Sequence, residues 1–119
     1  MNKEVKVTIP YIGRALSVNY YKIVGRSGFK TNKTRPEVEE WMVELAERVK
    51  GVQFTSDHLT ISLFGRFTDS RVPDLANLHK VIGDAIADGL GMDDRNFKFR
   101  DLGYSTGWLR PELEITIED

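Results

Sequence analysis

Residues 58–67 alternate apolar and polar side chains, and this pattern constrains the fold more than any other stretch. Leu59, Ile61 and Leu63 fall on one face of an extended segment, and mainly polar side chains fall on the other. A strand with one apolar face must bury that face against a second layer of structure. The alternation therefore predicts a sheet that is covered on one side by other elements of the chain.

Two segments have the spacing that suits the covering layer. Residues 36–50 begin with a proline, repeat apolar side chains at intervals of three and four, and are followed by Gly51. Proline favours the first helical turn, and glycine favours the position just after a helix. Residues 74–88 repeat apolar side chains in the same way. Both segments are predicted to be amphipathic helices.

The remaining periodic segments complete an α+β fold, with a single mixed β-sheet and two helices packed against it. A length of 119 residues suits one domain, so we expect residues 1–119 to form it. Two strands joined by a glycine-containing turn are expected to form a hairpin near the amino terminus. The predicted strands besides 58–67 are residues 4–12, 17–24, 29–31, 97–104 and 112–117.

The composition excludes several classes of site. The chain has no cysteine, which rules out disulfides, zinc–thiolate sites and a cysteine nucleophile. His58 and His79 are its only histidines, so a site with several histidine ligands is not expected. No apolar run has the length of a membrane span, and the first six residues mix charges unlike a signal peptide. A cytoplasmic protein without a membrane partner is therefore predicted.

Charge is distributed unevenly along the chain. Residues 1–35 contain eight Lys or Arg and one acidic residue, a net charge of +7, whereas the other 84 residues have nine basic and 17 acidic side chains, a net charge of −8. A basic segment attracts nucleic-acid phosphates, although it could also be a solvated arm without a partner. The candidate DNA-binding residues are Arg14, Lys22, Arg26, Lys30, Lys33 and Arg35, with Arg66 and Arg71 near the acidic region.

The acidic region, residues 69–94, contains the candidate metal-binding and catalytic residues. Asp74 is at the start of the second predicted helix, Lys80 lies on that helix, and the pair Asp93–Asp94 follows it. Converging carboxylates form a hard-oxygen site for Mg²⁺ or Mn²⁺, and a nearby lysine can neutralise phosphate charge. Each residue also has a structural interpretation. Asp74 can cap the helix, residues 91–95 can form a polar turn, and Lys80 can pair with Asp84.

The motif Pro-Asp-Leu-Ala-Asn-Leu-His-Lys at residues 73–80, followed by Asp84-Ala85 and by Asp93-Asp94, resembles the RusA family of Holliday-junction resolvases. Residues 17–21 and 111–117 match that family in kind and order. The resemblance implies a homodimeric endonuclease that cleaves branched DNA with a divalent metal. It also implies that Asp74 and Asp94 bind the metal, and that Lys80 is catalytic.

The chain departs from the family motif at one position. The family usually has an aspartate where this chain has Ala76, so one carboxylate ligand is missing. Asp69, Asp84 or Asp93 could replace it, although helical spacing puts Asp84 too far from Asp74, and Asp93 is the better candidate. Three functions remain open: a Mg²⁺-dependent, structure-selective endonuclease, a branched-DNA-binding module that no longer cleaves, and a small interaction domain without nucleic acid.

Overall fold

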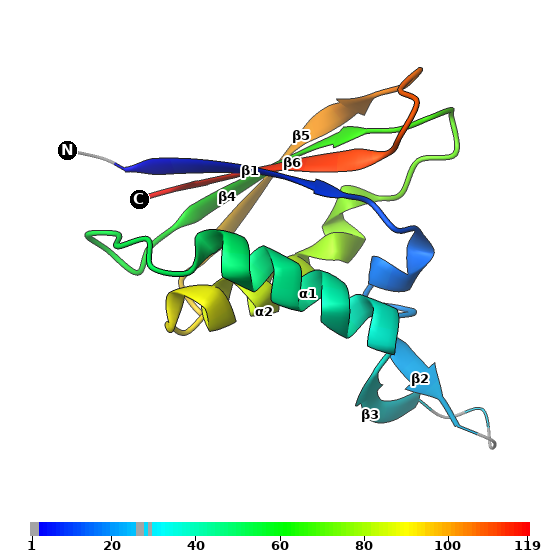
Figure 1. Cartoon of the computed structure of the whole chain (residues 1–119), viewed down its shortest axis with the longest axis horizontal. Helices are drawn as coiled ribbons and strands as arrows, with labels where there is room; N and C mark the ends of the chain where they lie inside the picture. Colours follow the sequence, from blue (N-terminus) through cyan, green and yellow to red (C-terminus); the bar gives the residue numbers. More distant parts are fainter. Residues whose placement is uncertain (1–2, 26–27, 29) are drawn as a thin grey trace.

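The computed structural model describes residues 3–25, 28 and 30–119, and it confirms the α+β fold, with helices packed on a mixed sheet (Figure 1). The main sheet has four strands in the order β1-β6-β4-β5, and β2 and β3 form a separate hairpin. The elements are β1 (Glu4–Pro10), η1 (Arg14–Leu16), β2 (Lys22–Val24), β3 (Lys30–Thr34), α1 (Pro36–Val49), β4 (Thr60–Arg66), η2 (Leu75–Leu78), α2 (His79–Leu90), β5 (Lys98–Ser105) and β6 (Glu112–Glu118), where η1 and η2 are 3₁₀ helices.

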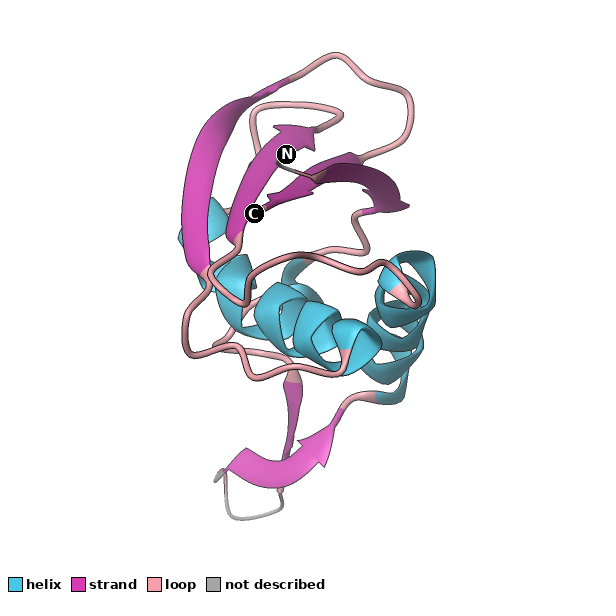
Figure 2. Ribbon diagram, turned by 90° about the vertical axis from the view of Figure 1, so that its left-hand side faces the viewer, coloured by secondary structure: helices cyan, strands magenta, loops and turns pink. Residues whose placement is uncertain are grey.

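Strand β4 lies inside the sheet, as its alternating pattern predicts. It pairs antiparallel with β6, where Ile61 lies opposite Ile117 and Leu63 opposite Ile115, and it pairs parallel with β5. Figure 2 shows both helices on one side of this sheet. The four side chains Ile61, Leu63, Ile115 and Ile117 are all fully buried, and they form the sheet side of the core.

The two helices pack closely beneath the sheet. Val38, Trp41, Leu45 and Val49 of α1 are buried, which confirms the predicted apolar stripe. A Cβ atom on Gly89 of α2 would lie 2.4 Å from the carbonyl oxygen of Ala46 in α1. The helices can therefore approach at this crossing because residue 89 has no side chain.

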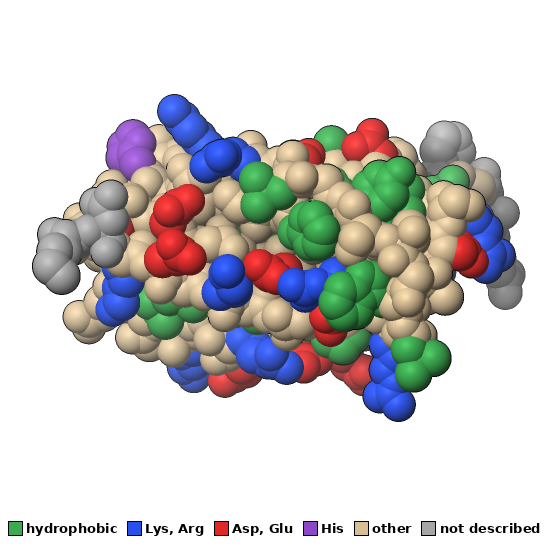
Figure 3. Space-filling model, turned by 90° about the horizontal axis from the view of Figure 1, so that it is seen from above, with side chains coloured by type: hydrophobic (Ala, Val, Ile, Leu, Met, Phe, Trp, Pro, Cys, Tyr) green, Lys and Arg blue, Asp and Glu red, His purple; other side chains and the backbone are tan. Residues whose placement is uncertain are grey.

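The opposite face of the sheet is open and carries paired charges. Arg66 forms ion pairs with Glu112 at 3.0 Å and with Glu114, and Lys6 pairs with Glu114 at 3.4 Å. In Figure 3, which views the molecule from the sheet side, basic and acidic side chains are interspersed. This face therefore does not present a field of one sign.

The predicted strand over residues 17–24 is wrong in its first half. Only Lys22–Val24 is extended, and the chain before it forms η1 and a turn in which the amides of Tyr20 and Tyr21 donate to the carbonyl of Ser17. The hydroxyl of Ser17 also accepts the amide of Asn19, at 3.2 Å. These local bonds satisfy the backbone without a strand partner, and such bonds compete with sheet formation.

The second helix starts later than its apolar spacing predicts. Leu75–Leu78 form a 3₁₀ turn, and the α-helix runs from His79 to Leu90. Leu75 and Leu78 are both buried, which either kind of helix achieves at a spacing of three residues. Gly91 ends α2 in the left-handed conformation, with φ of 66°.

The hairpin of β2 and β3 projects from the body of the molecule in Figure 1. It confirms the predicted hairpin, with its second strand at Lys30–Thr34. Arg26, Ser27 and Phe29 lie outside the described residues. Within the described part of the chain, no helix has the length and apolar character needed to cross a membrane.

Candidate functional site

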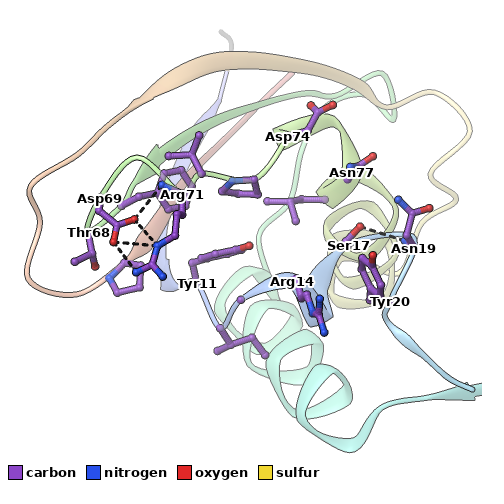
Figure 4. A pocket seen from close by; sticks show the side chains of 17 residues that line it. Tyr11, Arg14, Ser17, Asn19, Tyr20, Thr68, Asp69, Arg71, Asp74 and Asn77 are labelled. Atoms are coloured by element: carbon purple, nitrogen blue, oxygen red, sulfur yellow. Dashed lines mark hydrogen bonds and ion pairs between the residues drawn. The ribbon is translucent and has the colours of Figure 1, made fainter.

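A cleft with a volume of about 1040 Å³ lies beside Asp74. Figure 4 shows Asp74 and Asn77 on one wall and Tyr11, Arg14 and Tyr20 on the facing wall. The cleft is built by three segments that are far apart in the sequence. Its lining consists of Tyr11, Ile12, Gly13, Arg14, Ser17, Asn19, Tyr20, Phe67, Thr68, Asp69, Arg71, Val72, Pro73, Asp74, Asn77, Leu78 and Pro111.

The floor of the cleft depends on a glycine in β4. A Cβ atom on Gly65 would lie 2.2 Å from the ring of Phe67, so the ring can fold back over the strand only because residue 65 is glycine. The Phe67 ring is buried and meets the ring of Tyr11 edge-on, with 5.3 Å between centroids. Burial raises the pKa of the Tyr11 hydroxyl above its usual value of 10.

Asp74 is the N-cap of η2, as the sequence predicts. Its backbone is extended, with φ of −74° and ψ of 114°, and one carboxylate oxygen accepts the amide of Ala76 at 3.1 Å. Asp74 therefore precedes the regular helix, and residue 76 lies directly beside its carboxylate. Two such neighbours could share one ion only in this arrangement, because residues two apart in a regular helix point in nearly opposite directions.

Lys80, on α2, and Asp94, in the loop after it, lie close enough for their charges to interact. Lys80 Nζ is 3.2 Å from the Asp84 carboxylate, and the hydrogen bond to Asp84 raises the pKa of Lys80. Tyr21 and Asp94 also raise this pKa, by smaller charge interactions. A Cβ atom on Gly83 would lie 3.9 Å from an Asp94 carboxylate oxygen, so Asp94 rests against the helix.

The carboxylates that could replace the missing ligand all have basic partners. Asp69 pairs with Arg71 at 2.7 Å, and Asp84 pairs with Lys80. Asp93 pairs with Arg95 at 3.1 Å and also accepts the backbone amide of Arg95 at 2.9 Å. By contrast, among the residues that the structure describes, neither Asp74 nor Asp94 is paired with a basic side chain.

The structure brings Asp94 near Lys80, whereas Asp74 lines the first cleft. Asp94 lines a second, open cleft of about 670 Å³ with Asp84, Asp88 and Asp93. Over residues 3–25, 28 and 30–119, no three Asp, Glu or His side chains converge as a metal site. The donor chemistry of Asp74 and Asp94 still fits Mg²⁺, which takes one or two carboxylates and completes its shell with waters and phosphate oxygens.

The predicted DNA-binding residues fall into three groups. Arg14 and Arg71 line the first cleft, and Arg35 lies close to it because its Nε donates to the carbonyl of Tyr20 at 2.6 Å. Lys22, Lys33 and the backbone of Lys30 belong to the hairpin, whereas Arg26 is among the residues not described. Arg66 is held by two glutamates on the open face of the sheet.

Several residues that the structure brings together are not among the predicted site residues. Tyr11, Asn19, Tyr20 and Asn77 all line the first cleft. For Asn19 and Tyr20, the match of residues 17–21 to the RusA family offered a signal. A pair formed by His79 and Asp101, with 2.8 Å between Nε2 and Oδ1, had no sequence signal, because its members are 22 residues apart.

The His79–Asp101 pair is part of the contact between α2 and β5. The His79 ring stacks on the ring of Phe99, with 4.2 Å between centroids and 13° between planes. Phe99 also packs near Gly83, where a Cβ atom would lie 3.3 Å from the ring. These contacts fix the first turn of α2, which carries Lys80.

Comparison with known proteins gives no family assignment. No protein-family model matches the chain, and no curated protein sequence matches it. The case for a function therefore rests on the residues of the site and on the motif of residues 73–94.

Proposed function

We propose that the protein is a metal-dependent, structure-selective endonuclease that cleaves branched DNA such as a four-way junction. The observation that carries this proposal is the difference among the aspartates of residues 69–94. Asp69, Asp84 and Asp93 have basic partners, whereas Asp74, Asp88 and Asp94 are exposed and, among the described residues, have none. Of these three, Asp74 and Asp94 are the two that belong to the motif of residues 73–94 identified from the sequence. Carboxylates without a cationic partner are suited to binding a cation.

The chain's own residues have distinct tasks in this proposal. Asp74 and Asp94 supply hard oxygen ligands, and a bound divalent cation would polarise the scissile phosphate and activate water. Lys80 contributes positive charge next to Asp94. Lys80, whose hydrogen bond to Asp84 raises its pKa further above the usual 10.5, is protonated at neutral pH and can stabilise charge on the phosphate.

The basic residues of the cleft and the hairpin hold the DNA backbone. Arg14, Arg35, Lys22 and Lys33 belong to the cleft, its border and the hairpin. Contacts to phosphates do not distinguish base sequence, so selectivity for a branch has to come from the shape of the DNA. Arg66 is a weaker candidate, because Glu112 and Glu114 already neutralise it.

A second candidate function is a branched-DNA-binding module without cleavage. Ala76 removes a carboxylate from the motif, and the described residues contain no convergent group of three Asp, Glu or His side chains. The basic cleft and hairpin would bind DNA equally well without a metal. The two functions therefore differ only in whether a divalent cation produces nicks.

The test is a nicking assay on a labelled four-way junction with Mg²⁺, Mn²⁺ or EDTA. We expect metal-dependent nicks that Asp74→Asn and Asp94→Asn reduce by about a hundredfold or more, because each substitution removes a charged ligand. Glu47→Gln is the control, since it removes an exposed carboxylate from α1. Junction binding without nicks under every condition would favour the binding module, and failure to prefer a junction over linear duplex would reject both functions.

A further inference from the structure

The first cleft has the features of a site for a nucleotide base. Its volume is about 1040 Å³, and Asp74 lies at its edge, on the wall opposite Tyr20 (Figure 4). The cleft combines a flat aromatic surface, side-chain amides and two arginines, Arg14 and Arg71. Phosphate binding alone would require the arginines but neither the aromatic surface nor the amides.

Tyr20 provides the aromatic surface. Tyr20 is exposed, with 46% of its surface accessible. The guanidinium of Arg14 lies 5.1 Å from the centroid of its ring. The backbone of Tyr20 is held on both sides, because its amide donates to Ser17 at 2.9 Å and its carbonyl accepts from Arg35 at 2.6 Å. An exposed ring on a fixed backbone is suited to stacking with a base.

Asn19 and Asn77 provide amides at the edge of the same space. Among the described residues, neither side-chain amide is hydrogen-bonded to another protein group. The two segments that carry these residues are joined through the backbone, since the amide of Val18, next to Asn19, donates to the carbonyl of Asn77 at 2.8 Å. A free carboxamide presents one acceptor and two donors, which complement the polar edge of a base.

A base that is paired and stacked inside a duplex cannot enter such a cleft. A base can enter after it leaves the stack, and this costs least where pairing and stacking are already disturbed. The branch point of a junction is such a place. Arg71 also lines the cleft, and its side chain is 89% exposed although it pairs with Asp69.

We propose that the cleft binds one unpaired nucleotide from the branch point, with its base stacked on Tyr20 and its polar edge bonded to Asn19 and Asn77. The nucleotide anchors the strand so that a neighbouring phosphodiester lies at Asp74. This inference rests on the proposed function, because it assumes a branched DNA substrate. It adds a base-binding site that determines where the strand is held.

The test measures junction binding without metal, using four-way junctions in which single nucleotides around the branch are replaced in turn by abasic residues. For the unmodified protein, removal of the bound base should weaken binding by at least about fivefold at one position. Tyr20→Ala should weaken binding to the intact junction by a similar factor. In that variant the abasic residue should have no further effect, since base and ring belong to one contact.

Two variants separate stacking from other effects. Tyr20→Phe keeps the ring and should behave like the unmodified protein. Tyr104→Ala removes a similarly exposed tyrosine, 54% accessible, from β5 outside the cleft lining, and should retain sensitivity to the abasic residue. Equal weakening of Tyr20→Ala on linear duplex and on the junction would overturn the proposal, because Tyr20 would then support general DNA binding.

The remaining outcomes separate this inference from the proposed function. If the protein prefers the junction to linear duplex but tolerates an abasic residue at every position, the base-binding site is wrong and the proposed function stands. If the protein shows no preference for the junction, the proposed function fails and the base-binding site fails with it.

Discussion

Ala76 lies where a single side chain can change the charge of the candidate metal site. Its backbone amide donates to the Asp74 carboxylate at 3.1 Å, and the residue is exposed. An aspartate at this position would place a second carboxylate next to Asp74 and draw a divalent cation more strongly. We therefore expect Ala76→Asp to raise Mg²⁺ or Mn²⁺ affinity by about tenfold and to increase nicking with it.

Calorimetry with Mn²⁺ and the junction-nicking assay would measure the two effects of Ala76→Asp. Ala76→Asn is the matched control, because it adds a side chain of the same size without the negative charge. Equal metal affinity in both variants would show that residue 76 does not contribute to metal binding. Junction binding should be similar in all three proteins, since the phosphate contacts come from basic residues elsewhere.

The pKa of Asp69 indicates whether Arg71 pairs with Asp69 in the loop between β4 and η2. Hydrogen bonds from the side chain and then the backbone amide of Arg71 lower the pKa of Asp69 from 3.8 to about 2. A carboxyl group whose pKa is lower in the folded than in the unfolded protein stabilises the fold at pH values above its unfolded pKa. This stabilisation is therefore complete above about pH 4 and is lost as the pH falls toward 2.

A carboxyl titration by NMR should give a midpoint near pH 2 for Asp69. In Arg71→Ala the pKa should rise but stay below 3.8, because the backbone amide of residue 71 remains as a donor. Arg95→Ala is the reciprocal control, and it should raise the pKa of Asp93 while leaving that of Asp69 unchanged. If the pKa of Asp69 is the same in Arg71→Ala as in the unmodified protein, the ion pair is not formed in solution.

At the scale of elements, the helix crossing depends on Gly89. A Cβ atom there would lie 2.4 Å from the Ala46 carbonyl oxygen and 2.6 Å from a methyl carbon of Val49. Gly89→Ala should therefore push α2 away from α1 and lower the free energy of unfolding by about 1–3 kcal/mol. Tm should fall by about 5 °C or more, measured by circular dichroism.

Asp88→Ala is the control for the helix crossing, because residue 88 is the exposed neighbour of Gly89 in the same helix. Surface substitutions of this kind usually change stability by no more than about 0.5 kcal/mol. If Gly89→Ala is as stable as the unmodified protein, α1 and α2 are not packed as closely as the structure describes.

Elements with a continuous apolar pattern were predictable from the sequence, because the burial of one face fixes their periodicity. The stripe of α1 and the alternation of β4 are examples, and both are buried as expected. The turn of residues 17–20 was not predictable in this way, since local bonds from Ser17 replace a strand partner. The 3₁₀ turn of η2 was not predictable for a different reason. A spacing of three residues between leucines suits both a 3₁₀ helix and an α-helix.

The candidate site was predictable only in part. The cap at Asp74 and the pair Lys80–Asp84 follow from local spacing, and the structure contains both. The cleft could not be predicted, because residues 11–20 and 67–78 come together only when the sheet forms. The clefts that Asp74 and Asp94 line also depend on tertiary packing, which the motif alone does not describe.

At the scale of the whole molecule, a two-fold dimer is expected. Symmetric cleavage of a four-way junction needs two sites, whereas one chain carries a single motif of Asp74, Lys80 and Asp94. Two-fold dimers are also the commonest oligomers. Light scattering at micromolar concentration should give about twice the chain mass of 13.6 kDa, and a monomer under these conditions would count against the resolvase function.

The charge distribution of the whole molecule leads to a prediction about salt. The described residues extend over 50 × 35 × 20 Å, and Figure 1 shows the hairpin of β2 and β3 projecting from the body. Residues 1–35 carry a net charge of +7, and Arg26, Lys30 and Lys33 contribute three of its positive charges. If these residues contact phosphates, binding releases counterions and weakens steeply as salt rises.

Replacing Arg26, Lys30 and Lys33 together with alanine should flatten the plot of log affinity against log salt, by about 0.9 for each DNA phosphate that the protein no longer neutralises. The control replaces three exposed cations outside the basic segment, Lys50, Lys98 and Arg110, and therefore changes the net charge equally. Fluorescence anisotropy with a labelled junction across a salt series measures both slopes. Equal slopes in the two triple variants would show that net charge governs binding, whereas a smaller slope only in the first variant would locate the DNA contacts in the hairpin.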